Sequence, residues 1–191
     1  RRGAGNPGSI DRIHPDKRMK GKGNTEMSFL ERIVAEKQRE IEEASRAVPE
    51  KRLREQAAGI RAKRPFAGNL QNGTADDPRI IAEFKQASPS KGPIRSGLDP
   101  ATYARACEAG GAAAMSVLTD SRFFQGSLEY ARMVRNAVDL PVLRKDFILS
   151  GYQIWETRAA GLDAVLVIVR ILESSQLRAL LALCGQVELY A

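Results

Sequence analysis

The C-terminal part of the chain repeats one unit: a short apolar run, a polar loop and then a helical pattern. The apolar runs lie at 80–84, 114–118, 140–144 and 164–169. Runs of this length suit buried strands, and the longer segments between them suit helices. Strand, loop and helix repeated in series predict a parallel α/β fold.

Four helices are expected between and after these strands, with boundaries set by capping residues. Asp and Ser are good N-caps, Pro fits the first helical turn, and Gly favours the C-terminal cap. The signals are Asp99-Pro100 and Gly110-Gly111 around the first helix, Ser127 before the second, Gly151 and Gly161 around the third, and Ser174 and about Cys184 at the two ends of the fourth.

Two architectures fit this rhythm, an open doubly wound sheet and a (β/α)8 TIM barrel. The first strand–helix turn has no G-x-G-x-x-G or Walker pattern, and polar residues follow several strands, which favours the barrel. A complete barrel needs about 200–250 residues. Because the repeating region covers only 80–191, we expect the first four βα units and the start of a fifth strand at 187–191, a truncated barrel.

The N-terminal segments differ from this repeat. Residues 1–26 are rich in Gly and charge without periodicity, so we expect a disordered basic tail, possibly non-native, ahead of a partial barrel domain at 27–191. Ser28 and Glu31 have capping-box spacing at the start of an extra helix over 28–46. A polar, basic connector with two prolines then leads to the βα units, which begin at about residue 79.

Charge and histidine content exclude several classes of function. Residues 1–26 hold seven Lys and Arg and three Asp and Glu, which is +4 of the net charge of +7, so no basic face for nucleic acid is expected in the domain. The one histidine, His14, lies in this tail, which removes histidine-based catalysis and histidine-bound zinc. Any acid–base chemistry must come from Lys, Glu or Asp.

Cysteine spacing and hydropathy indicate the cellular compartment in which the protein is expected. Cys107 and Cys184 are far apart, fit no metal-ligand spacing, and are interpreted as buried thiols in a reducing compartment. No apolar run approaches a membrane span, and the N-terminus has no secretory apolar core. We therefore expect a cytoplasmic protein with no membrane partner and no metal.

The segment 79–92 contains the strongest candidate for chemistry. Side chains in a strand alternate, so Glu83 and Lys85 share one face while Phe84 lies on the other. An acid and a base at a strand end cost desolvation free energy, which favours a catalytic strand. A structural ion pair is the alternative, and position alone does not separate the two.

Three other segments end at the same edge of the predicted sheet. Lys145 closes the third strand and is either a general acid or a lysine that reaches solvent. Phe124 follows another aromatic residue in the polar loop 119–127, where it either stacks on a planar ligand or packs the loop. Leu166 shares a face with Ile168 and provides an apolar wall.

Five motifs in collinear order resemble the indole-3-glycerol phosphate synthase family. The motifs are Ile-Ile-Ala-Glu-Phe-Lys-Gln-Ala-Ser-Pro-Ser-Lys-Gly (80–92), Ser-Val-Leu-Thr-Asp (116–120), Phe-Phe-Gln-Gly-Ser (123–127), Pro-Val-Leu-Arg-Lys-Asp-Phe (141–147) and Tyr-Gln-Ile (152–154). The similarity extends over roughly residues 28–191.

The resemblance implies a lyase of tryptophan biosynthesis that needs no cofactor. The family closes the pyrrole ring of 1-(2-carboxyphenylamino)-1-deoxyribulose 5-phosphate, a phosphorylated small molecule, with loss of CO2 and water. By motif, Lys145 is the expected general acid, Glu83 orients the lysines and Lys85 supports the phosphate side. The expected substrate-binding residues are Ser88, Phe124, Phe147 and Leu166.

The family's remaining site residues are expected beyond Ala191, including a second catalytic carboxylate on strand five and the phosphate-binding loops. We therefore expect the 191 residues alone to have no useful synthase activity. Two alternatives remain. One is another phosphosugar barrel enzyme such as phosphoribosylanthranilate isomerase. The other is a non-catalytic half-barrel that self-associates through its open strand edges.

Overall fold

The computed structural model describes residues 27–60, 63–71, 73–94 and 97–191. The expected tail at 1–26 lies outside them. Three N-terminal helices precede the sheet: α1 (Phe29–Ala47), α2 (Glu50–Ala58) and α3 (Phe66–Gln71). The remaining elements are β1 (Ile81–Phe84), β2 (Ala87–Ser88), β3 (Gly92–Pro93), α4 (Pro100–Ala109), β4 (Ala114–Leu118), α5 (Ser121–Phe124), α6 (Leu128–Ala137), β5 (Val142–Lys145), α7 (Gly151–Ala159), β6 (Ala164–Val165), the 3-10 helix η1 (Val169–Ile171) and α8 (Ser174–Gln186).

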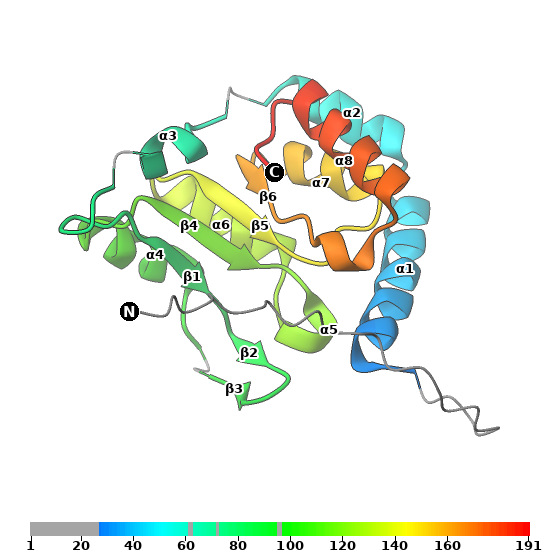
Figure 1. The fold of residues 1–191 in the computed structure, drawn as a ribbon, viewed down its shortest axis with the longest axis horizontal. Helices are drawn as coiled ribbons and strands as arrows, with labels where there is room; N and C mark the ends of the chain where they lie inside the picture. The colour runs from blue at the N-terminus through cyan, green and yellow to red at the C-terminus, as the bar shows by residue number, and fades with distance from the viewer. Residues whose placement is uncertain (1–26, 61–62, 72, 95–96) are drawn as a thin grey trace, which may run out of the picture.

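Four strands form one parallel sheet in the order β1-β4-β5-β6, which confirms the predicted α/β repeat (Figure 1). The fourth strand is shorter than expected, because β6 ends at Val165 and the chain turns into η1 at Val169. The expected fifth strand is represented in the described residues by one bridge, in which Tyr190 pairs with Ala164.

Alternate residues of the strands pack on opposite faces, as the sequence predicts. The outward side chains of Phe84, Met115, Val117 and Val142 are fully buried against α4 and α6. The Phe84 ring lies 5.6 Å from Tyr103 and 5.9 Å from Tyr130. Because this face is sealed by helices, the other face of the sheet is the one that remains for a site.

The predicted connector between the extra helix and the βα units is wrong, since it contains α2 and α3. Leu53 and Ala57, one turn apart, are the two buried residues of α2, whose other residues are mostly charged or polar. An apolar face this narrow is hard to see in the sequence. In α3, Phe66 packs against Ala114 and Ala164 on the inner face of the sheet.

The predicted caps are largely confirmed. Ser28 and Glu31 form the capping box of α1, Asp99 caps α4 ahead of Pro100, and Ser127 caps α6. The prediction that Ser174 caps the last helix is wrong by one residue, because Glu173 holds that position. Within the described ranges no helix is both long and apolar enough to cross a bilayer.

Candidate active site

Glu83, Lys85 and Lys145 come together on the inner face of the sheet, at the C-terminal ends of β1 and β5. The Lys85 ammonium lies 2.8 Å from one Glu83 oxygen, and Lys145 donates a hydrogen bond to the other. Lys145 is level with Leu118 on β4, so its side chain reaches across β4 to β1. The three residues, called the inner cluster below, are 27–39% exposed, which leaves them accessible to a ligand.

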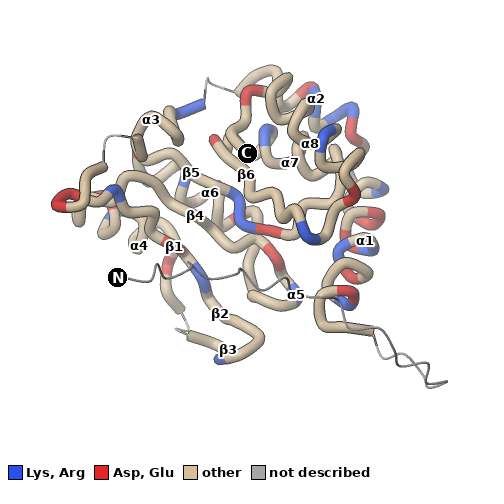
Figure 2. The backbone as a smooth tube through the Cα atoms, in the orientation of Figure 1, with Lys and Arg blue, Asp and Glu red and all other residues tan. Residues whose placement is uncertain are grey.

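The two lysines hold Glu83 in its charged form. Partial burial alone raises the pKa of the Glu83 carboxyl, but the hydrogen bonds from Lys145 and Lys85 outweigh burial and keep this pKa below its usual range. One carboxylate faces two ammonium groups, so the inner cluster has an excess of positive charge. Figure 2 shows the neighbouring acidic and basic residues on the tube at β1 and just before β2.

Two predicted aromatic residues flank this end of the sheet. Phe124 ends α5 and Phe147 follows β5, and their ring centroids are 6.3 Å apart with the planes inclined by 38°. Asp120 caps α5 by accepting a hydrogen bond of 2.7 Å from the Phe123 amide. A side chain at Gly126 would meet the Leu118 carbonyl oxygen at 2.3 Å, so the loop can close this tightly only with glycine.

The other two predicted binding residues lie on separate segments. Ser88, in the β2–β3 hairpin, accepts a hydrogen bond of 3.3 Å from the Lys91 amide, and its hydroxyl lies 3.5 Å from that of Ser90. Leu166 directly follows β6, and its amide donates to the Arg144 carbonyl at 3.0 Å. The contacts in the described residues join Glu83, Lys85 and Lys145 directly and pair Phe124 with Phe147.

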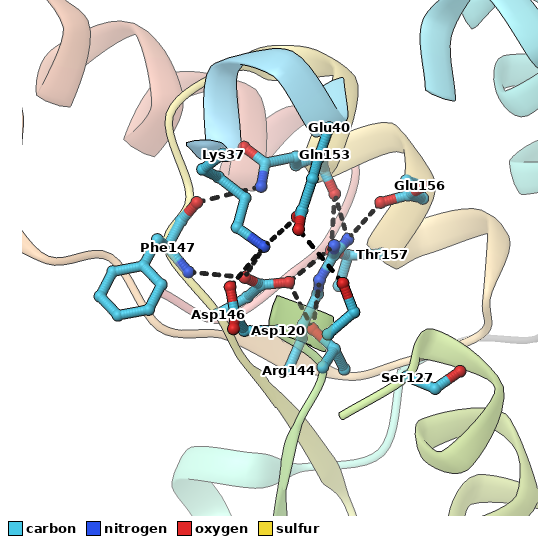
Figure 3. A network of polar contacts seen from close by, with 12 residues as sticks. Lys37, Glu40, Asp120, Ser127, Arg144, Asp146, Phe147, Gln153, Glu156 and Thr157 are labelled. Carbon is cyan, nitrogen blue, oxygen red and sulfur yellow. Dashed lines mark hydrogen bonds and ion pairs between the residues drawn. The ribbon is translucent and has the colours of Figure 1, made fainter. Parts of the chain in front are cut away.

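A second charged group, the outer network, lies near the same strand ends, on the side of the sheet opposite the inner cluster (Figure 3). It was not predicted from the sequence. It consists of Lys37, Asp120, Arg144 and Asp146, which are all buried. Lys37 reaches from α1 to Asp120 at 2.8 Å and to Asp146 at 3.0 Å. Arg144 lies 3.1 Å from Asp146 and 2.7 Å from Glu156 on α7.

One sequence signal for Lys37 exists. It lies midway between Ile33 and Ile41 at four-residue spacing, so it is a charged residue within the apolar face of α1. A lysine at such a position needs a buried acidic partner. The sequence does not say which acid this is, because Asp120 and Asp146 belong to distant segments.

Mutual pairing keeps the outer network charged. Burial alone raises the pKa of Asp146, but the charges of Arg144 and Lys37 and a hydrogen bond from Thr119 lower it to about 2. Burial likewise favours the neutral form of Lys37, yet Asp146, Asp120 and Glu40 raise its pKa above the ordinary lysine value. Lys37, Arg144 and Asp146 are therefore ionised at neutral pH.

In the described part of the chain, no group of three or more His, Cys, Asp or Glu side chains is arranged to hold a metal ion. The inner cluster offers two ammonium groups and one carboxylate, and the aromatic pair adds two rings. Such a set can protonate an oxygen, neutralise an anion and hold a flat ring.

The family model and three relatives that match this chain have the same description. Residues 30–190 match the family model described as indole-3-glycerol phosphate synthase. A protein of that name from Desulfosudis oleivorans is 52% identical over 161 residues, which cover 82% of this chain and 60% of the relative. One from Chlorobium chlorochromatii is 47% identical over 165 residues, covering 86% of this chain and 64% of the relative.

A third relative of the same name, from Rhodopirellula baltica, is 48% identical over 151 residues, which cover 79% of this chain and 58% of the relative. The chain thus spans about 60% of the length of the curated relatives that it matches. The family is one of TIM barrels, in agreement with the parallel strand–helix repeat seen here. The chain belongs to the indole-3-glycerol phosphate synthase family.

Proposed function

We propose that this chain carries the general-acid part of an indole-3-glycerol phosphate synthase active site. The reaction converts 1-(2-carboxyphenylamino)-1-deoxyribulose 5-phosphate to indole-3-glycerol phosphate, CO2 and water. The observation that carries the proposal is the contact of Lys145 with Glu83 across β4, beside an aromatic pair and open to solvent.

The inner cluster supplies the charges that this chemistry needs. Lys145 donates a proton to the substrate carbonyl oxygen as the ring closes, and Glu83 fixes the direction of its ammonium group. Lys85, held 2.8 Å from Glu83, neutralises charge on the phosphate side. Ser88 positions the hairpin that follows β1, through its contacts within the β2–β3 turn.

The aromatic pair supplies the binding geometry. Phe124 and Phe147 hold the carboxyphenyl ring, with Leu166 as an apolar wall, so that the ring carbon lies near the carbonyl carbon that it attacks. Fixing two reacting atoms in this way lowers the entropic part of the barrier. The positive inner cluster then faces the polar chain of the substrate and the apolar side chains face its ring.

The chemistry also needs a base, and within the described residues the one carboxylate of the inner cluster is engaged by two lysines. We therefore propose that residues 1–191 alone give no turnover and that the site needs groups from the part of the relatives that the match does not cover.

A chimera tests the proposal directly. The region of the Desulfosudis oleivorans relative beyond the matched part is placed after Ala191, and indole-3-glycerol phosphate formation is followed with the carboxyphenylamino substrate. We expect turnover by the chimera and none by the 191-residue chain. An inactive but folded chimera would refute the proposed function, and turnover by the chain alone would refute the need for further groups.

The same chimera separates the synthase from the other phosphosugar enzyme. Phosphoribosylanthranilate is offered in a parallel assay, with the two substrates at equal concentration. We expect conversion of the carboxyphenylamino substrate only, because the inner cluster places two lysines around one carboxylate at the strand ends. Conversion of phosphoribosylanthranilate instead would assign the site to an isomerase.

A non-catalytic self-associating half-barrel is the second candidate, and one observation favours it. Ile80 and Ile81 are 54% and 43% exposed at β1, which has β4 as its sheet neighbour in the described residues. Exposed apolar strand edges promote pairing between chains. Sedimentation of the 191-residue chain tests this, since a stable monomer over a wide concentration range excludes it.

For the cellular setting we propose a reducing, cytoplasmic compartment, which the two free thiols support. Of the two cysteines predicted to be buried, Cys184 is buried, whereas Cys107 is only partly buried.

A further inference from the structure

Lys37 connects two loops that the proposed function uses. The loop after β4 contains Asp120 and leads to Phe124, and the loop after β5 contains Asp146 next to Phe147. The Lys37 ammonium lies 2.8 Å from Asp120 and 3.0 Å from Asp146. A single side chain from α1 thus bridges the two segments that present the aromatic rings (Figure 3).

Each of the two aspartates is close in sequence to its aromatic residue. Phe147 is the residue after Asp146, and its amide donates to the Asp146 carboxylate at 2.8 Å. Asp120 caps α5, the single helical turn that ends at Phe124. Each carboxylate therefore holds the backbone next to its aromatic residue as well as the Lys37 ammonium, which links the position of the ammonium to that of the two rings.

We propose that Lys37 is a positioning residue for the substrate ring, whose ammonium group fixes the spacing of Phe124 and Phe147 through Asp120 and Asp146. The role toward the substrate rests on the proposed function, whereas the role toward the two rings does not. Without the ammonium, Asp120 and Asp146 lose their shared cation and repel each other. The loops then separate and the aromatic pair opens.

The ring positions are measured in the 191-residue chain by fluorine NMR after incorporation of 4-fluorophenylalanine. The chain has six Phe residues, and Phe124→Leu and Phe147→Leu assign the two signals of interest. In Lys37→Met we expect both signals to shift or broaden, while that of the buried Phe84 stays unchanged. Lys37→Arg, which keeps a cation between the two acids, restores both signals at least in part.

Arg46→Met is the matched control, because it removes a cation from α1 that pairs with exposed Glu42. Its spectrum should equal that of the wild type. If Lys37→Met does not fold, Asp120→Asn is added to it, which removes the repulsion and keeps an oxygen to cap α5. We expect this double variant to fold with both signals still displaced. Unchanged Phe124 and Phe147 signals in a folded variant without Lys37 would overturn the proposal.

Kinetics of the chimera test the consequence for the substrate. Lys37→Met is expected to raise KM for the carboxyphenylamino substrate about tenfold, as for a lost aromatic contact. A purely structural role would lower only the active fraction, and hence the apparent kcat, with KM unchanged. An inactive wild-type chimera would count against the proposed function alone, because the NMR result stands without turnover.

Discussion

The inner cluster and the outer network meet at the same strand ends but differ in exposure and in pairing. The inner cluster is 27–39% exposed and has two ammonium groups for one carboxylate. The side chains of Lys37, Asp120, Arg144 and Asp146 are at most 6% exposed, and both cations contact at least two carboxylates. An exposed excess of charge can contact a substrate directly, whereas a buried network with every charge paired acts through the segments that it holds in place.

One strand separates the two groups. Arg144 and Lys145 are adjacent on β5, and strand alternation sends Arg144 outward into the network and Lys145 inward to Glu83. Two neighbouring residues of the same charge therefore have different roles, Arg144 in the buried network and Lys145 in the exposed inner cluster. Removing Arg144 should act mainly on stability, whereas removing Lys145 should act mainly on activity.

The largest effect on stability is expected from Arg144→Met. This variant leaves Asp146 and Glu156 without their guanidinium partner, and the loss of one member of a buried ion pair costs about 3–5 kcal/mol. Urea unfolding of the 191-residue chain measures it. Arg46→Met, the exposed control, should change the unfolding free energy by less than about 0.5 kcal/mol. Equal effects of the two variants would remove the distinction between buried and exposed pairs.

The second-largest effect on stability is expected from acid, which weakens the outer network. The pKa of Asp146 is about 2 in the fold against an ordinary value of 3.8. Since the folded pKa is the lower one, its contribution is complete above the unfolded pKa and is lost as the pH falls from about 4 towards 2. The loss is about 2 kcal/mol.

Urea unfolding at a series of pH values from 5 to 2.5 measures this loss in the wild type and in Asp146→Asn. Lys37 and Arg144 stay charged throughout this range, and the comparison with Asp146→Asn isolates the contribution of this carboxyl. The variant should lose correspondingly less stability over the acid range. An identical pH dependence in both proteins would show that Asp146 is not a source of the acid sensitivity.

The smallest effect is expected in the aromatic pair. Phe124→Leu in the chimera keeps an apolar side chain but removes the ring that lies 6.3 Å from Phe147. An aromatic contact contributes about 0.5–1.5 kcal/mol, so KM should rise roughly 2- to 12-fold with little change in stability. Phe66→Leu, on the opposite end of the sheet, is the control, and an equal rise in KM there would argue against a specific ring contact.

Much of the inner cluster was predictable because it depends on local rules. Strand alternation puts Glu83 and Lys85 on one face, and parallel strands bring the end of β5 to the same edge. The outer network depends instead on where α1 docks, which is a tertiary contact. The sequence marks Lys37 as unusual within the apolar face of α1, but its partners follow only from the packed structure. For α2, an apolar face of two residues was too narrow to reveal the helix.

The most direct test of the account compares Lys145→Met with the wild type in two measurements. The first is turnover of the carboxyphenylamino substrate by the chimera, and the second is the unfolding free energy of the 191-residue chain. The account predicts a fall in kcat of about 10²- to 10⁴-fold, the usual contribution of a general acid. It also predicts a stability change within about 1 kcal/mol, because Lys145 is 39% exposed. Retained turnover, or a loss of stability as large as that of Arg144→Met, would contradict it.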